Sequence, residues 1–122
     1  MKKAVILIIF WIIFVACYIA YGEDVPIIGV ASYYSVESSS NITASGEVFK
    51  EEGLTCAYMD VPFNSILKVT NIDNGKSVIV RVNDTGNFKK KYNRMIDLSK
   101  GAFSKIADLE NGLIRVKIEW LK

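Results

Sequence analysis

Asp84 and Glu47 are the two carboxylates whose places in the sequence favour a chemical role. Asp84 ends the stretch 77–84, in which valines alternate with other residues as in a β-strand with one buried face. A glycine at 86 frees the backbone to turn just behind it. A carboxylate at the exposed end of a rigid strand is a common active-site element, although a solvated turn aspartate has the same local pattern. Glu47 directly follows a glycine suited to a left-handed turn.

Residue types absent from the chain narrow the possible chemistry. The sequence contains no histidine, which excludes Ser-His-Asp and Cys-His sites and leaves no histidine to replace Asp84 in proton transfer. No cluster of residues has metal-ligand spacing, so we expect neither a metal nor another cofactor. Cys56 lies in an apolar stretch and is expected to be a small buried hydrophobe.

The first 22 residues are typical of a targeting segment. Lys2 and Lys3 precede an apolar run without charge through residue 21, and Ala20 and Gly22 offer the small residues that a signal peptidase recognises. Two alternatives remain: an uncleaved membrane anchor, and a lipoprotein that carries its lipid on Cys17. All three predict an exported, cell-envelope protein.

The length of the chain after residue 22 is that of one small domain, and its charge is balanced. The 122 residues suffice for a single core. The chain has 15 Lys and Arg against 13 Asp and Glu, so without Lys2 and Lys3 the balance is 13 against 13. This neutrality argues against nucleic acid as a partner.

The hydrophobic pattern predicts a mainly β domain. Six segments are expected to be strands: 27–34, 54–58, 66–71, 77–83, 95–98 and 114–120. Asn74 and Gly75 predict a hairpin in which both residues tolerate positive φ. Ser99 is expected to cap a helix that runs to about residue 108, and residues 48–53 are a candidate helical turn. Six short strands with one or two short helices indicate a small β-barrel.

Eight short motifs, in this order, carry a family resemblance: GVASYY (29–34), TASGE (43–47), LT (54–55), PF (62–63), VTN (69–71), NGKS (74–77), RVND (81–84) and IDLS (96–99). Their order resembles the rare lipoprotein A (RlpA) family over residues 27–121. The resemblance implies a six-stranded double-psi β-barrel. It also implies an envelope lytic transglycosylase, monomeric and acting on the glycan strands of peptidoglycan.

The resemblance also implies a mechanism and its residues. A lytic transglycosylase cuts between N-acetylmuramic acid and N-acetylglucosamine without water and leaves a 1,6-anhydro product. Asp84 matches the family aspartate and is the expected acid/base, and Glu47 matches a glutamate expected beside it across the cleft. Two nearby carboxylates tend to separate their pKa values, which keeps one protonated near neutral pH. Asp97 also matches, and we interpret it as structural because it precedes the helix cap.

The expected sugar-binding residues surround these carboxylates. They are Tyr33, Tyr34 and Tyr58, whose rings suit stacking on sugars, together with Asn83 and Thr85 beside Asp84.

The sequence departs from the family pattern near this site. Tyr58 stands at the family's histidine and, at an ordinary pKa, does not titrate near pH 7 as histidine does. Thr85 and Asn87 replace an arginine and a proline, and Asn64 replaces a glycine. These departures keep open a second function, a non-catalytic glycan-binding or expansin-like wall-loosening module.

Overall fold

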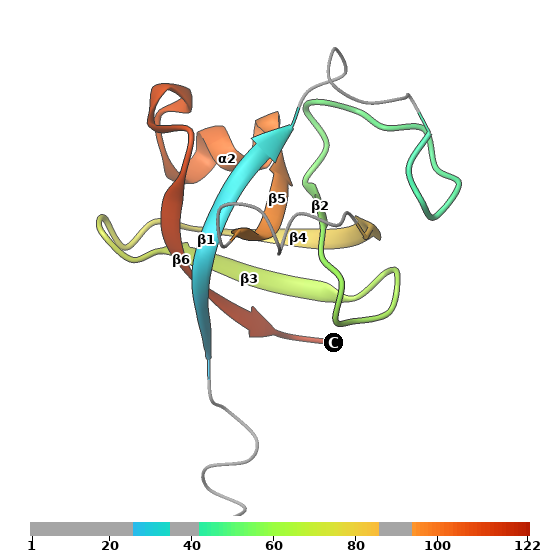
Figure 1. Cartoon of the computed structure of the whole chain (residues 1–122), viewed down its shortest axis with the longest axis horizontal. Helices are drawn as coiled ribbons and strands as arrows, with labels where there is room; N and C mark the ends of the chain where they lie inside the picture. The colour runs from blue at the N-terminus through green and yellow to red at the C-terminus, as the bar shows by residue number, and fades with distance from the viewer. Residues whose placement is uncertain (1–25, 35–41, 86–93) are drawn as a thin grey trace, which may run out of the picture.

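The computed structural model describes residues 26–34, 42–85 and 94–122. The predicted leader with Cys17, and positions 86 and 87, lie outside these ranges. The elements are β1 (Ile27–Tyr34), β2 (Thr55–Ala57), β3 (Ile66–Asn71), β4 (Ser77–Asp84), β5 (Arg94–Ser99), α2 (Lys100–Ile106), the 3-10 turn η2 (Leu109–Asn111) and β6 (Ile114–Trp120) (Figure 1).

The described strands close into a barrel in the order β1-β5-β2-β4-β3-β6, with β6 pairing back to β1. β1 pairs with β5 and β2 with β4 in parallel, and the other neighbours are antiparallel. The prediction of a mainly β, six-stranded barrel is confirmed, and so is agreement with the double-psi fold. The predicted helical turn at 48–53 is wrong, because the chain there makes a turn in which Gly53 N donates to Lys50 O at 3.1 Å.

The core of the barrel comes from alternate residues of the strands. Val78, Val80 and Val82 of β4 are buried while Ile79 between them is exposed, as the alternation predicts. Helix α2 packs on the barrel with Phe103 and Ile106 fully buried. Each such side chain contributes about 1.5–3 kcal/mol through removal of apolar surface from water.

Backbone groups at the two ends of helix α2 form hydrogen bonds with side chains of β5, β3 and the β3–β4 hairpin. Ser99 Oγ accepts from Ala102 N at 3.2 Å, which confirms Ser99 as the N-cap. At the other end, Asn71 Nδ2 and Asn74 Nδ2 both donate to Ile106 O at 2.9 Å. The helix stops there, short of the predicted residue 108, because these two amides satisfy its terminal carbonyl.

The β3–β4 hairpin forms around the predicted Asn-Gly pair, but with a different turn. Gly75 has φ 74° whereas Asn74 does not have positive φ, and Gly75 N donates to Asn71 O at 2.8 Å. Asn74 is instead held by its side chain, which bonds Ile106 O and accepts from Lys76 N at 2.9 Å. The hairpin is therefore tied to the end of the helix.

Gly101, in the first turn of α2, lies against the backbone of the 48–53 segment. Its N–H donates to Glu51 O at 2.8 Å, and a Cβ there would lie 2.9 Å from the Cα and O of Glu52. No flexible side chain is available to move aside. The close approach requires glycine.

We predict that Gly101→Ala destabilises the domain by about 1–3 kcal/mol, because the clash with backbone exceeds the gain of about 1 kcal/mol in helix propensity. Urea unfolding monitored by circular dichroism measures the free energy of unfolding. Lys105→Ala, an exposed change in the same helix, is the control and should alter it by less than about 0.5 kcal/mol. A Gly101→Ala domain as stable as the wild type would contradict the predicted clash.

Candidate active site

A β-bulge in β4 determines which face of the sheet carries the Asp84 side chain. In the parallel pair β2–β4, Cys56 pairs with Val82 and the next residue, Ala57, pairs with Asp84, which leaves Asn83 as the extra residue of β4. Simple alternation from the buried valines would direct Asp84 toward the core. Because the extra residue shifts the register by one, Asp84 projects from the same face as Ala57.

Backbone donors orient the Asp84 carboxylate. Its Oδ1 accepts from Thr85 N at 2.8 Å and from Ala44 N, in the 43–47 turn, at 3.2 Å. The main chain of Asp84 is fixed as well, because Tyr58 N donates to its carbonyl at 3.0 Å. The two hydrogen bonds from N–H groups to Oδ1 set the direction of the carboxylate.

Asp97 is the carboxylate on the other side of Ala57. It pairs with Ala57 in β2–β5 and with Ser32 in β1–β5, so Asp84 and Asp97 flank one residue on the same face. Ser32 Oγ donates to Asp97 Oδ1 at 2.9 Å and itself accepts from Arg94 at 3.1 Å. Burial raises the pKa of Asp97, the negative charge of Asp84 adds to this, and Ser32 and Arg94 oppose it.

This placement changes the interpretation of Asp97. From the sequence we expected a structural role beside the helix cap, but the strand pairing places Asp97 on the same face as Asp84, on the other side of Ala57. The sequence signal was a carboxylate between Ile96 and Leu98, which are both fully buried. A charged residue in a strand this well covered has a high desolvation cost.

Glu47 lies in a different setting from the one predicted. Its two oxygens accept from the two terminal nitrogens of Arg81 at 2.5 and 2.7 Å, and Arg81 also donates to Asn64 Oδ1 at 2.9 Å. The bond from Arg81 holds the pKa of Glu47 below its usual value, with smaller effects from Asn83 and Ser45. The carboxyl group with a raised pKa is Asp97, chiefly through burial and to a smaller extent through the charge of Asp84, and not Glu47.

A groove of about 310 Å³ runs beside this ion pair. Its lining combines the ion pair, the bulge residue and the segment before β2, and consists of Glu47, Val48, Lys50, Gly53, Leu54, Thr55, Arg81 and Asn83. The groove has polar and charged walls, which suits a hydroxyl-rich ligand such as a sugar.

The structure places the three tyrosines in different surroundings. Tyr58 is 2% exposed and belongs to the core, so its ring has no face open to a sugar. Tyr33 packs on Phe103 and donates to Leu109 O at 3.2 Å, near the helix. Tyr34 packs its ring on Phe49, and burial, with smaller effects from the charges of Asp84 and Asp97, raises its pKa.

Asn83 and Thr85 flank Asp84 but differ in exposure. Asn83 is 2% exposed, and its carbonyl accepts from Ser45 N at 3.2 Å. Thr85 is exposed and orients Asp84 through its backbone N–H. The structure thus gathers Asp84, Asn83, Thr85 and Tyr34, and it adds Asp97.

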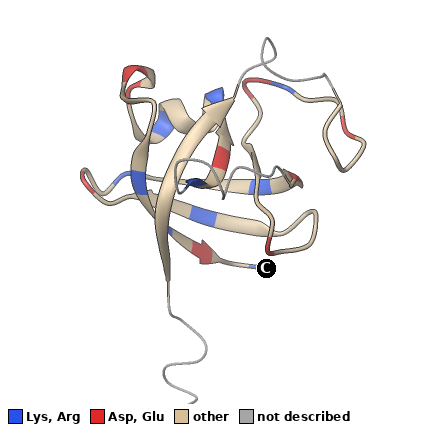
Figure 2. Cartoon of the chain, viewed as in Figure 1, with Lys and Arg blue, Asp and Glu red and all other residues tan. Residues whose placement is uncertain are grey.

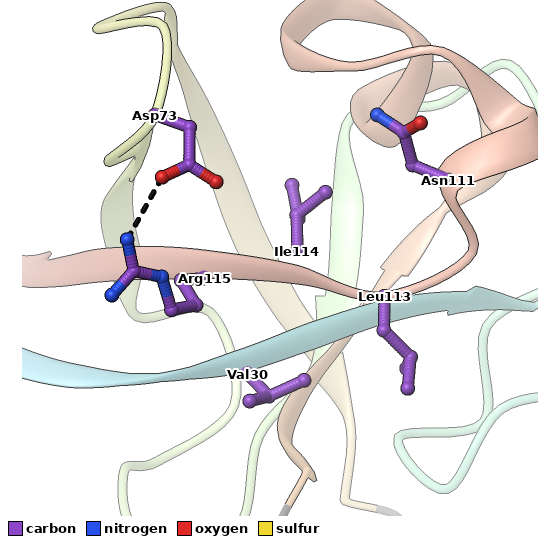
Figure 3. Close-up of a pocket in the computed structure, with 6 residues that line it drawn as sticks. All are labelled: Val30, Asp73, Asn111, Leu113, Ile114 and Arg115. Atoms are coloured by element: carbon purple, nitrogen blue, oxygen red, sulfur yellow. Dashed lines mark hydrogen bonds and ion pairs between the residues drawn. The ribbon is translucent and has the colours of Figure 1, made fainter.

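A second hollow of about 510 Å³ lies between β1, β6 and the β3–β4 hairpin (Figure 3). Its charged residues, Asp73 and Arg115, form an ion pair with each other at 2.9 Å. None of the predicted site residues lines it. Of the predicted site residues, Glu47 and Asn83 line the 310 Å³ groove, and Asp84 follows Asn83 at the end of β4 without lining it. We take this groove together with the end of β4 as the candidate active site.

The wider surface adds three observations. Acidic and basic residues are interspersed over the elements drawn in Figure 2. Within the described ranges, no group of three or more potential ligands is arranged to hold a metal ion. In the same ranges, no helix has the length and apolar character needed to cross a membrane.

Comparisons with known proteins show which family and which relatives the chain resembles. Residues 27–118 match the family model described as lytic transglycolase. The chain is 47% identical over 92 residues to the endolytic peptidoglycan transglycosylase RlpA of Pseudomonas aeruginosa, covering 75% of this chain and 26% of that protein. It is 44% identical over 101 residues to the Campylobacter jejuni protein of the same name, covering 83% of this chain and 35% of that protein. The chain therefore spans about a quarter to a third of these relatives.

A solved structure shares the fold at lower identity. An expansin mutant from Clavibacter michiganensis, solved in complex with cellohexaose, aligns with a TM-score of 0.63 at 20% identity. The alignment covers 80% of this chain and 51% of the expansin. This likeness concerns the barrel alone.

We predict that Asp97→Asn becomes relatively more stable than the wild type as pH rises from 3 to 7. A raised pKa in the folded state means that stability is lost as pH rises through that pKa, and asparagine has no charge to bury. Urea unfolding at both pH values measures the difference. Asp108→Asn, at an exposed position, is the matched control. A difference that stays constant or falls toward pH 7 would exclude a charge penalty at Asp97.

Proposed function

The chain belongs to the lytic transglycolase family of double-psi β-barrels, and from this membership we propose that it cleaves peptidoglycan glycan strands as an endolytic transglycosylase. The names of its Pseudomonas and Campylobacter relatives support this activity. The observation that carries the proposal is the Asp84 carboxylate, held by two backbone N–H groups at the end of β4 and on the same face as Asp97.

The proposed reaction needs one proton delivered and one removed. Asp84 protonates the glycosidic oxygen as its bond to C1 of N-acetylmuramic acid breaks. The C6 hydroxyl of the same sugar then attacks C1 and returns its proton to Asp84, which closes the 1,6-anhydro ring without water. Carboxylates beside the ring stabilise the oxocarbenium-like transition state.

Asp97 is the second carboxyl group on this face. Burial raises its pKa, the charge of Asp84 adds a smaller effect, and Ser32 and Arg94 oppose both. We assign Asp84 to proton transfer because it stands at the end of its strand, where β4 stops, whereas Asp97 is inside β5.

A second candidate function is favoured by Tyr58. The residue at the family's histidine position is a tyrosine buried in the core, so no histidine is available there for proton transfer. A barrel of this kind would bind glycan and loosen the wall without turnover. Both functions have peptidoglycan glycan strands as the partner.

We also propose that residues 1–22 direct the domain to the cell envelope. The charged start and the apolar run of the sequence support export, by a cleaved signal, an anchor or a lipid on Cys17. An exported domain would reach its glycan substrate directly.

We predict that Asp84→Asn abolishes release of 1,6-anhydromuropeptides from sacculi, with a loss of about 100-fold or more, because the amide keeps the shape but cannot exchange the proton. Mass spectrometry of the soluble products measures turnover, and a sacculus pull-down measures binding, which should persist.

Asp108→Asn is the matched control and should retain full turnover, since Asp108 is exposed and makes no side-chain cap bond at η2. Anhydro products from the Asp84→Asn domain at the wild-type rate would exclude Asp84 as the acid/base. A wild-type domain that binds sacculi and releases no anhydro product at any pH would establish the binding module instead.

A further inference from the structure

The 43–47 turn carries one of the two N–H groups that orient Asp84. The turn closes on itself through Thr43 N to Glu47 O and Gly46 N to Thr43 O, both at 2.9 Å, with Gly46 at φ 89°. It meets the end of β4 at Ser45 N to Asn83 O and at Ala44 N to Asp84 Oδ1, both at 3.2 Å. These two long bonds alone are a weak attachment.

The strong attachment of the turn is the Glu47–Arg81 pair. Both carboxylate oxygens accept from the guanidinium, and bidentate pairs of this kind are directional as well as strong. Arg81 lies on β4 three residues before Asp84, so the pair joins the last residue of the turn to the strand that bears the aspartate.

Asn64 fixes the guanidinium from the other side. Its Oδ1 accepts from the same nitrogen that bonds Glu47 Oε2, and its N–H donates to Val82 O at 2.7 Å. Asn64 has φ 71°, a left-handed conformation that asparagine tolerates better than most residues. The position that resembles a family glycine thus keeps the backbone conformation and adds a contact to Arg81.

We propose that Glu47 is a positioning residue, which with Arg81 clamps the 43–47 turn so that the Ala44 N–H orients the Asp84 carboxylate for proton transfer. The inference rests on the proposed function. It gives Glu47 a positioning role in place of the catalytic carboxylate that the sequence predicted beside Asp84. Glu47 has both oxygens engaged by a permanently charged group, and protonating it would break the pair.

The clamp is tested by a double-mutant cycle with a charge swap. Glu47→Gln and Arg81→Gln should each lower kcat for anhydromuropeptide release by about 10–100-fold, the loss expected from a small misplacement, with KM nearly unchanged. The two changes together should lose no more than either alone, because they break one interaction. The swap Glu47→Arg with Arg81→Glu should regain most of kcat.

Amide hydrogen exchange of Ala44, followed by NMR, reports the clamp without any turnover. Exchange should accelerate in each single variant and slow again in the swap. Asp73→Asn, which breaks the exposed pair with Arg115 in the β3–β4 hairpin, is the matched control and should change neither Ala44 exchange nor kcat. Urea midpoints of all variants separate these effects from global unfolding.

The outcomes distinguish the clamp from the proposed function. A Glu47→Gln domain as inactive as Asp84→Asn, with Ala44 exchange unchanged and no recovery in the swap, would overturn the clamp and make Glu47 a catalytic residue. If the wild type releases no anhydro product, the proposed function fails and Ala44 exchange alone decides. Faster exchange in Glu47→Gln then supports the clamp, and unchanged exchange overturns it.

Discussion

The parallel pairing of β2 with β4, and the extra residue at Asn83 within it, is the constraint on which the candidate site depends. The pairing closes the barrel between its two halves, so β4 has a rigid partner up to its last residue. The extra residue reverses the facing of Asp84 relative to the buried valines before it. Without it, the carboxylate would face an apolar core, where a charge is strongly disfavoured.

Asp84 and Asp97 have different surroundings because Asp84 is the last residue of β4 whereas Asp97 lies inside β5. Backbone donors orient the Asp84 carboxylate at the end of its strand, whereas burial raises the pKa of Asp97. Ser32 and Arg94 offset part of that cost for Asp97. Two carboxyl groups held in such different environments on one face are a known basis for acid–base chemistry near neutral pH.

One wall of the groove contacts helix α2 and its cap. Gly53 lines the groove, and its carbonyl accepts from Ser99 Oγ, the same hydroxyl that caps α2, at 2.5 Å. Gly101 packs against the adjoining Glu52 backbone. The wall of the groove before β2 is thus supported by the helix, and Arg81 and Glu47 hold the opposite side. A site supported on both sides keeps its geometry when a substrate binds.

The sequence by itself determined the strands, the place of the hairpin and the Ser99 cap, because alternation, turn residues and capping are local properties of the chain. It also predicted the barrel, through the order of its motifs. Only the tertiary structure decided that Asp97 lies on the same face as Asp84, that Arg81 forms an ion pair with Glu47, and that Tyr58 is buried. These facts depend on pairings between distant segments, as between Glu47 and Arg81, and on strand register. A single bulge changes which face a residue takes, and the local pattern around Asp84 carries no sign of it.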